Sequence, residues 1–110
     1  MAGRDKQELY ARQAEIVKAL AHPVRLAVVD FLKGGEQCVC HIAGHVGSEQ
    51  SNLSKHLAVM SAAGLLSQRK EGLNVYYKLR CPCVHEFVSC VTGVIKEQVK
   101  EAGKLAEALG

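Results

Sequence analysis

The sequence predicts a mainly helical domain with one short β-hairpin in its second half. Apolar residues recur at helical spacing along most of the chain, and an aromatic and β-branched run over 75–79 follows a polar turn. The chain has 110 residues, a length typical of one domain. Its 48% hydrophobic and 23% charged residues are typical of a folded globular protein and argue against disorder. We therefore expect a single domain over residues 1–110.

The first half of the chain is expected to contain three helices. The first covers residues 8–20 and ends near His22-Pro23, because proline disfavours helix in the residue before it. The second begins at Pro23, which suits a first helical turn, and stops at Gly34-Gly35. The third is short, covers residues 38–46 and is closed by Gly47.

The second half is expected to contain a fourth helix, the hairpin and a long last helix. Ser48 is a favourable N-cap for the fourth helix, in which Leu53, Leu57 and Met60 form a buried stripe. The hairpin pairs residues 65–69 with 75–79. The last helix covers residues 84–109, and its apolar stripe is wide enough to need a partner surface. The stripe consists of Val84, Phe87, Val88, Val91, Val94, Ile95, Val99, Leu105 and Leu109. We therefore expect a homodimer formed through the terminal helices.

Residues 38–63 have the pattern of a helix-turn-helix, with a short helix, a tight turn at Gly47-Ser48 and a second helix with a polar outer face. In such a motif the second helix enters the major groove of DNA, where hydroxyl, amide and ammonium groups bind base edges or phosphates. The polar face is formed by Gln50, Ser51, Asn52, Ser54, Lys55 and His56. A plain helical bundle with a polar face is the alternative interpretation of the pattern.

The hairpin, residues 65–80, is expected to be a wing along the DNA backbone or in the minor groove. The net charge of the chain is +3, and the basic residues concentrate in this segment. Residues 69–80 carry Arg69, Lys70, Lys78 and Arg80 against the single acid Glu71. Such a local basic patch is the electrostatic footprint of DNA binding, and Arg69 and Lys70 are its candidate contacts.

Composition and patterning exclude several other classes. No apolar run approaches the roughly 18 residues of a transmembrane helix. The N-terminus is charged and lacks the apolar middle of a signal peptide. We expect a cytoplasmic protein with no membrane partner. An enzyme is not expected, because the chain lacks a Cys-x-x-Cys motif and a βαβ pattern.

The chain resembles the ArsR/SmtB family of metal-responsive winged-helix repressors in two runs, LAHPVRLAVVDFL and CVCHIAGHVGSEQSNLSKHLAVMSAAGLLSQRKEGLNVYYKL. The similarity covers residues 16–80, and three motifs carry it together. They are S-x-H-L (Ser54, His56, Leu57), A-G-L-L (Ala63–Leu66) and R-x-E-G…Y (Arg69, Glu71, Gly72, Tyr77). The resemblance implies a dimeric repressor that binds double-stranded operator DNA and releases it when an inducer binds.

Five cysteines form two Cys-x-Cys pairs and a single residue, namely Cys38, Cys40, Cys81, Cys83 and Cys90. In the cytoplasm they are expected to be reduced. Thiolates bind soft ions, and three of them in trigonal geometry suit trivalent arsenic. Residues two apart lie about 200° apart around a helix. The thiols of Cys38 and Cys40 can therefore face one ion only if the chain is extended or distorted there.

The first pair, Cys38 and Cys40, resembles the C-V-C sequence that opens the third helix in arsenic- and cadmium-responsive members of the family. Members that bind trivalent arsenic there commonly add a cysteine three residues on, where this chain has Ala43. The family's other route, cysteines from the N-terminal arm, is closed because residues 1–37 contain none. The first pair would therefore need a thiol of the last helix.

The second set, Cys81, Cys83 and Cys90, is the arrangement we favour. Pro82 is expected at the first position of the last helix, so Cys83 lies in the first turn, where the helix dipole lowers the pKa of a thiol. Cys90 is on the same face but roughly 10 Å further along the axis. The three can meet only if the first turn loosens or the partner helix of a dimer supplies a thiol.

The sequence therefore predicts a repressor whose thiolates bind a thiophilic inducer. Trivalent arsenic or antimony is favoured, followed by cadmium, lead or zinc. The main alternative is a redox or polysulfide sensor of the same fold, in which Cys38 or Cys40 is bridged to Cys90. A metal-binding protein without DNA is a more remote alternative.

Overall fold

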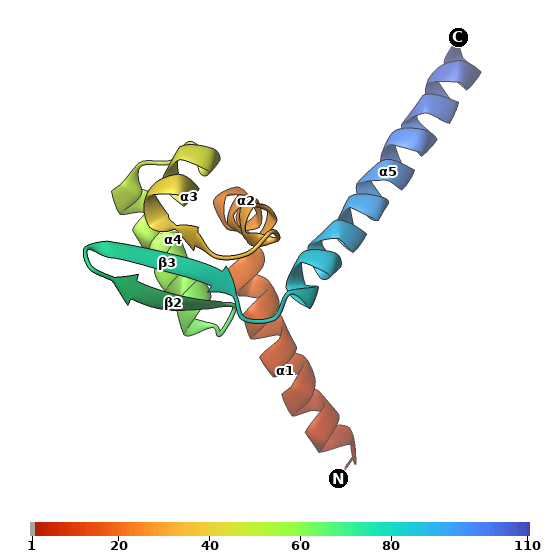
Figure 1. The fold of residues 1–110 in the computed structure, drawn as a ribbon. Helices are drawn as coiled ribbons and strands as arrows, with labels where there is room; N and C mark the ends of the chain where they lie inside the picture. The colour runs from red at the N-terminus through yellow and green to blue at the C-terminus, as the bar shows by residue number, and fades with distance from the viewer. Residues whose placement is uncertain (1) are drawn as a thin grey trace.

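The computed structural model describes residues 2–110, which form five helices and a three-stranded sheet. The helices are α1 Ala2–Leu20, α2 Pro23–Leu32, α3 Val39–Val46, α4 Gln50–Ala62 and α5 Cys83–Leu109; the strands are β1 Gln37–Cys38, β2 Leu66–Glu71 and β3 Asn74–Leu79. Figure 1 shows a body built from α2, α3, α4 and the sheet, from which α1 and α5 project in different directions. The predicted mainly helical architecture with a hairpin is confirmed.

The core lies where α2, α3 and α4 meet. Val29 of α2 and Ile42 of α3 are fully buried. The predicted stripe of α4 is confirmed, because the exposed fractions of Leu53, Leu57 and Met60 are 0%, 1% and 0%. Burial of such a side chain stabilises the fold by roughly 1.5–3 kcal/mol. The stripe therefore fixes the rotation of α4 about its axis and turns the opposite face outward.

The sheet is antiparallel with the strand order β1-β3-β2. Strands β2 and β3 pair from Leu66 and Leu79 to Glu71 and Asn74, which leaves Gly72 and Leu73 as the turn. Gly72 has a φ of 62°, in the left-handed region that glycine adopts without strain. Strand β1 was not predicted, because two residues are too few to show an alternating pattern.

Three predicted helix ends are wrong. The first helix begins at Ala2 and not at residue 8, since its first turns are polar and carry no apolar periodicity. Glu49, and not Ser48, is the N-cap of α4, and the Ser48 hydroxyl accepts a 3.3 Å hydrogen bond from Asn52 Nδ2. Pro82 is the N-cap of α5 and not its first residue.

The long helix α5 contributes no buried residue to the body. Phe87, Val91 and Ile95 expose 48%, 48% and 54% of their surface. Val84 and Val88 are partly buried against the core, whereas the rest of the apolar stripe expected on this helix is exposed in one chain. No helix within residues 2–110 is long and apolar enough to cross a membrane.

Candidate nucleic-acid interface and thiol pairs

Helices α3 and α4 form the predicted helix-turn-helix. Gly47 ends α3 with a left-handed φ of 65°, and its N–H donates to the carbonyl of Ala43 at 3.1 Å. This conformation lets the chain reverse within the few residues before α4 begins at Gln50. The body thereby presents α4 as a surface helix.

The outer face of α4 carries five of the six predicted DNA-binding residues of this helix. The exposed residues are Gln50, Ser51, Asn52, Ser54 and Lys55. The Ser54 hydroxyl donates to the carbonyl oxygen of Gln50 at 2.9 Å, so this side chain lies along the helix. The Lys55 ammonium has no ion pair in the described part of the chain, residues 2–110. This face offers amide, hydroxyl and ammonium donors to a groove.

The prediction that His56 lies on the outer face is wrong. His56 is only 9% exposed, and its Nδ1 accepts a 3.1 Å hydrogen bond from Arg25 Nε. Its ring centroid lies 4.2 Å from that of His22. Burial, together with the nearby His22 and Arg25, lowers the pKa of His56. The signal was present in the sequence, because His56 lies three residues after Leu53 and four before Met60, on the buried side of the helix.

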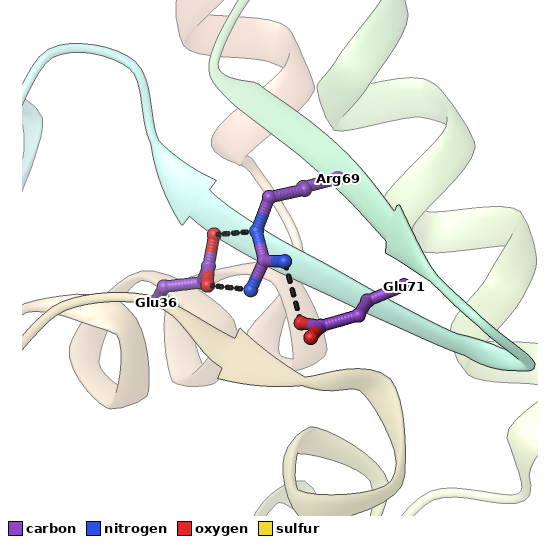
Figure 2. A network of polar contacts seen from close by, with 3 residues as sticks. All are labelled: Glu36, Arg69 and Glu71. Carbon is purple, nitrogen blue, oxygen red and sulfur yellow. Dashed lines mark hydrogen bonds and ion pairs between the residues drawn. The ribbon is translucent and has the colours of Figure 1, made fainter.

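The wing places Lys70 in the open, while Arg69 is held by two carboxylates. Arg69 forms a two-bond ion pair with Glu36 and a further one with Glu71, as Figure 2 shows. The hydrogen bonds from Arg69 hold the pKa of the Glu36 carboxyl below its usual range. Glu36 was missed by the sequence analysis, since no local pattern indicates a contact between residues 33 positions apart. Leu73, at the tip of the hairpin, is fully exposed.

The first thiol pair is brought together by an extended residue. Cys38 is the N-cap of α3 with φ −67° and ψ 143°, and Cys40 lies in the first turn. The two Sγ atoms are 2.8 Å apart. The condition that the chain be extended at this point is therefore met. The hydrogen bond from Cys40 and the backbone N–H groups of Cys40 and His41 lower the pKa of Cys38, and the same thiol–thiol bond raises the pKa of Cys40.

The second thiol pair is at the start of α5. The Sγ atoms of Cys81 and Cys83 are 2.7 Å apart, and both residues are exposed. The prediction that the pKa of Cys83 is lowered is wrong. Its hydrogen bond to Cys81, desolvation of the thiol and the charges of Cys81 and Glu86 raise the pKa of Cys83. These effects outweigh the backbone hydrogen bond at Cys83, which lowers this pKa.

Neither expected set of three ligands is assembled within one chain. In residues 2–110 no three His, Cys, Asp or Glu side chains are grouped closely enough to hold a metal ion. Cys90 lies seven residues beyond Cys83 along α5. Cys38 lies opposite Tyr76 in the sheet, and Cys81 is five residues beyond Tyr76, a span of up to about 16 Å along an extended chain. Within residues 2–110, each pair therefore lies without a third His, Cys, Asp or Glu side chain close enough to share a metal ion.

An apolar groove lies beside the second pair. It has a volume of about 420 Å³ and runs between α1 and α5. Its lining includes Ile16 and Val17 of α1 and Cys83, Val84 and Phe87 of α5. One wall of this groove thus belongs to the exposed apolar stripe of α5, and Cys83 lies at its edge.

Comparison with known proteins identifies relatives along almost the whole chain. The family model described as "Bacterial regulatory protein, arsR family" matches residues 22–68. An uncharacterized HTH-type transcriptional regulator of Methanocaldococcus jannaschii is 34% identical over 104 residues, which is 93% of this chain and 99% of that protein. The arsenical resistance operon repressor of Escherichia coli is 39% identical over 66 residues, 59% of this chain and 56% of that protein.

A solved structure supports the same grouping. The homodimeric winged helix-turn-helix DNA-binding domain Mb0332 of Mycobacterium bovis, solved by NMR, aligns with a TM-score of 0.74 and 31% identity. The alignment covers 87% of this chain and 89% of that one. The hairpin and the helices around it therefore form a winged helix-turn-helix fold.

Proposed function

The chain belongs to the ArsR family of bacterial regulatory proteins, and from this premise we propose that it is a DNA-binding transcriptional repressor released from its operator by a thiophilic inducer. The observation that carries the proposal is the presence of two pairs of facing thiols, at 2.8 Å and 2.7 Å, on a winged helix-turn-helix body. Trivalent arsenic or antimony is the favoured inducer, with cadmium, lead and zinc next, because these ions bind thiolates. Such a repressor acts in the cytoplasm.

Operator binding is assigned to α4 and the wing. The exposed Gln50, Ser51, Asn52, Ser54 and Lys55 would meet the major groove, and Lys70 would meet a phosphate. His56 is withdrawn from this set because its imidazole is buried against α2. Two copies of the chain are needed to bind two half-sites one helical turn apart.

The second copy is proposed to pack on α1 and α5. The stripe of α5 is half exposed in one chain, and the groove of about 420 Å³ continues it onto α1. A second apolar helix would cover both surfaces. Because Cys83 lines this groove, a partner helix would bring further side chains close to the thiols of Cys81 and Cys83.

The thiols of each pair supply two of the three ligands that a soft ion such as trivalent arsenic needs. The third thiolate has to come from the last helix of the same or the partner chain. Cys81, Cys83 and Cys90 across the dimer remain the arrangement we propose first. Cys38 and Cys40 with a thiol of the last helix are the alternative, which the lowered pKa of Cys38 favours. When bound, the ion would supply a covalent link between thiols of separate segments.

A redox or polysulfide sensor is the second candidate. The short Sγ–Sγ separation within each pair favours it, because two thiols so close can form a disulfide after a small movement. In that reaction the two thiols lose two electrons and two protons, and a polysulfide takes them up and is reduced to sulfide and a shorter chain.

The test is a titration of the reduced, metal-free protein on operator DNA. An operator is first selected from random duplex DNA, and its binding is then followed by fluorescence anisotropy with arsenite, antimonite, cadmium, lead, zinc or polysulfide. Release by arsenite or antimonite supports the favoured inducer, and release by polysulfide alone supports the redox candidate. A protein that binds no duplex DNA at all contradicts the repressor assignment and leaves a metal-binding protein.

Single Cys→Ser variants then locate the site. Loss of the arsenite response at Cys81, Cys83 and Cys90, with an unchanged response at Cys38 and Cys40, supports the C-terminal trio. The reverse pattern, with loss at Cys38 and Cys40, supports the C-V-C site. Metal-free operator affinity of each variant is the control, because a folding defect would lower it as well.

A further inference from the structure

The guanidinium of Arg69 donates three hydrogen bonds to carboxylates. Its Nε and one Nη donate to the two oxygens of Glu36, at 3.2 Å and 2.6 Å, and the other Nη donates to Glu71 at 2.6 Å. Figure 2 shows the planar group between the two acids. One positive charge is thus matched by two negative ones. The cluster of Glu36, Arg69 and Glu71 therefore carries a net negative charge that repels a phosphate, although the sequence analysis placed Arg69 in the basic patch of the wing.

The contact with Glu36 spans the sheet. Cys38 of β1, Tyr76 of β3 and Arg69 of β2 form one row across the three strands. The Arg69 guanidinium lies over the Tyr76 ring, 4.7 Å from its centroid. Glu36 precedes β1, so its bonds to Arg69 connect β2 with the entry to β1 across the middle strand.

The connection matters because β1 is short. Only Gln37 and Cys38 pair with β3, at Tyr77 and Tyr76. The hairpin of β2 and β3 extends well beyond these two pairs toward Gly72. The two-bond ion pair of Arg69 with Glu36 therefore adds a polar attachment between the wing and the body to the buried contacts of Leu66 and Leu79.

We propose that Arg69 is a positioning residue of the operator-binding surface, which holds the wing at a fixed angle to the body through Glu36 and does not itself bind phosphate. The inference rests on the proposed function, because it assigns a part of that same DNA-binding surface. Since Glu36 lies two residues before Cys38, the same attachment ties the wing to the first thiol pair. A ligand that binds both thiols acts on the backbone of Cys38, and this backbone belongs to the sheet that carries the wing.

Two isosteric variants separate positioning from phosphate binding. Glu36→Gln and Glu71→Gln each remove one negative charge next to Arg69, but only Glu36 reaches the body. If Arg69 binds a phosphate, both variants free its charge and raise operator affinity. If Arg69 positions the wing, Glu36→Gln lowers affinity by about three- to fivefold, the range of a well-formed exposed ion pair. Glu71→Gln then leaves affinity unchanged or raises it.

The readouts are anisotropy titrations of metal-free protein at several salt concentrations, with the melting temperature as the check on folding. We expect only Glu36→Gln to lower operator affinity, with the wild-type salt slope kept in this variant. Equal effects of the two variants, in either direction, overturn the proposal. Glu36→Asp, which keeps a carboxylate, restores affinity toward the wild type if the ion pair is the cause. A Glu36→Asp protein as weak as Glu36→Gln at an unchanged melting temperature contradicts it.

Because these measurements use metal-free protein, they remain decisive if no thiol ligand releases the operator. In that event the inducer part of the proposed function fails and the role of Arg69 stands on its own result. A coupling between an inducer and operator binding is typically 5–150-fold. Where arsenite does release the wild type, the link to the first pair predicts that this coupling is about threefold weaker in Glu36→Gln. Glu71→Gln should respond as the wild type does.

Discussion

Replacement of Ile95 by glutamate should convert a dimer into monomers. Ile95 exposes 54% of its surface in one chain, and Phe87, Val91, Val94 and Val99 are exposed to a similar or greater extent. Full burial of such a side chain contributes roughly 1.5–3 kcal/mol, so covering the exposed half contributes about 1 kcal/mol. In a symmetric dimer each position occurs twice, and the stripe as a whole contributes roughly 10 kcal/mol before the cost of association.

The glutamate removes this contribution and adds an unpaired carboxylate to the interface. Desolvation of a charge that has no partner costs several kcal/mol, so each protomer loses about 3 kcal/mol or more. Over two protomers the dissociation constant should rise by about four orders of magnitude, since 1.4 kcal/mol is a factor of ten. Operator affinity should fall with it, because a monomer binds only one half-site.

Sedimentation velocity at micromolar protein measures this directly, with anisotropy on operator DNA as the second readout. Ser89→Glu is the matched control, because it adds the same charge on the same helix, some 160° around the axis from Val91. The control should remain dimeric. An Ile95→Glu protein that sediments as the wild-type dimer would place the interface elsewhere and refute the reasoning from the exposed stripe.

Three further predictions concern the body of the domain. If the Lys55 ammonium binds a phosphate, Lys55→Ala should lower operator affinity and reduce its salt slope by about one. If Asn52 reads a base, Asn52→Ala should weaken the binding free energy for the selected operator by roughly 1–3 kcal/mol. Unchanged titrations of both variants would show that α4 does not enter the groove. The lowered pKa of His56 means that the unfolded chain takes up its proton first, so stability is complete above pH 6.5 and decreases as the pH falls below it toward the folded pKa. Chemical denaturation between pH 7 and 5 should show this decrease, and His56→Gln should flatten it. Gly47→Ala should destabilise the fold by roughly 1–2 kcal/mol in thermal melts, because it forces a side chain into left-handed backbone; an unchanged melting temperature would contradict the strain.

The order of the five helices and the hairpin, and the orientation of α4, follow from the sequence alone, whereas strand β1 does not. Helical periodicity is a local property, so the spacing of Leu53, Leu57 and Met60 was sufficient to orient α4 correctly. The stripe of α5 could be identified in the same way. Gly47 at the end of α3 and Gly72 in the hairpin marked the turns, because left-handed φ values favour glycine.

The partners of individual polar side chains were decided only by the tertiary structure. The helical spacing of His56 from Leu53 and Met60 indicates its buried side, but only the fold shows that Arg25 of α2 is its hydrogen-bond donor. The sequence places Arg69 in a basic patch, whereas the fold brings the carboxylate of Glu36, distant in sequence, into an ion pair with it. Contacts of this kind depend on how segments far apart in the chain pack, and no local spacing encodes them.

The cysteines illustrate both what the sequence determines and what only the fold decides. The composition shows five thiols that can bind soft ions. Helical geometry predicts that Cys38 and Cys40 face each other only if the chain is extended or distorted there. The fold met that condition by making Cys38 an extended N-cap that is held in the sheet by β3. It also kept the two pairs apart and left Cys83 beside the uncovered groove. Which sulphur atoms can converge is a property of packing between segments and between copies of the chain, whereas the chemistry they offer was already fixed by the residue types.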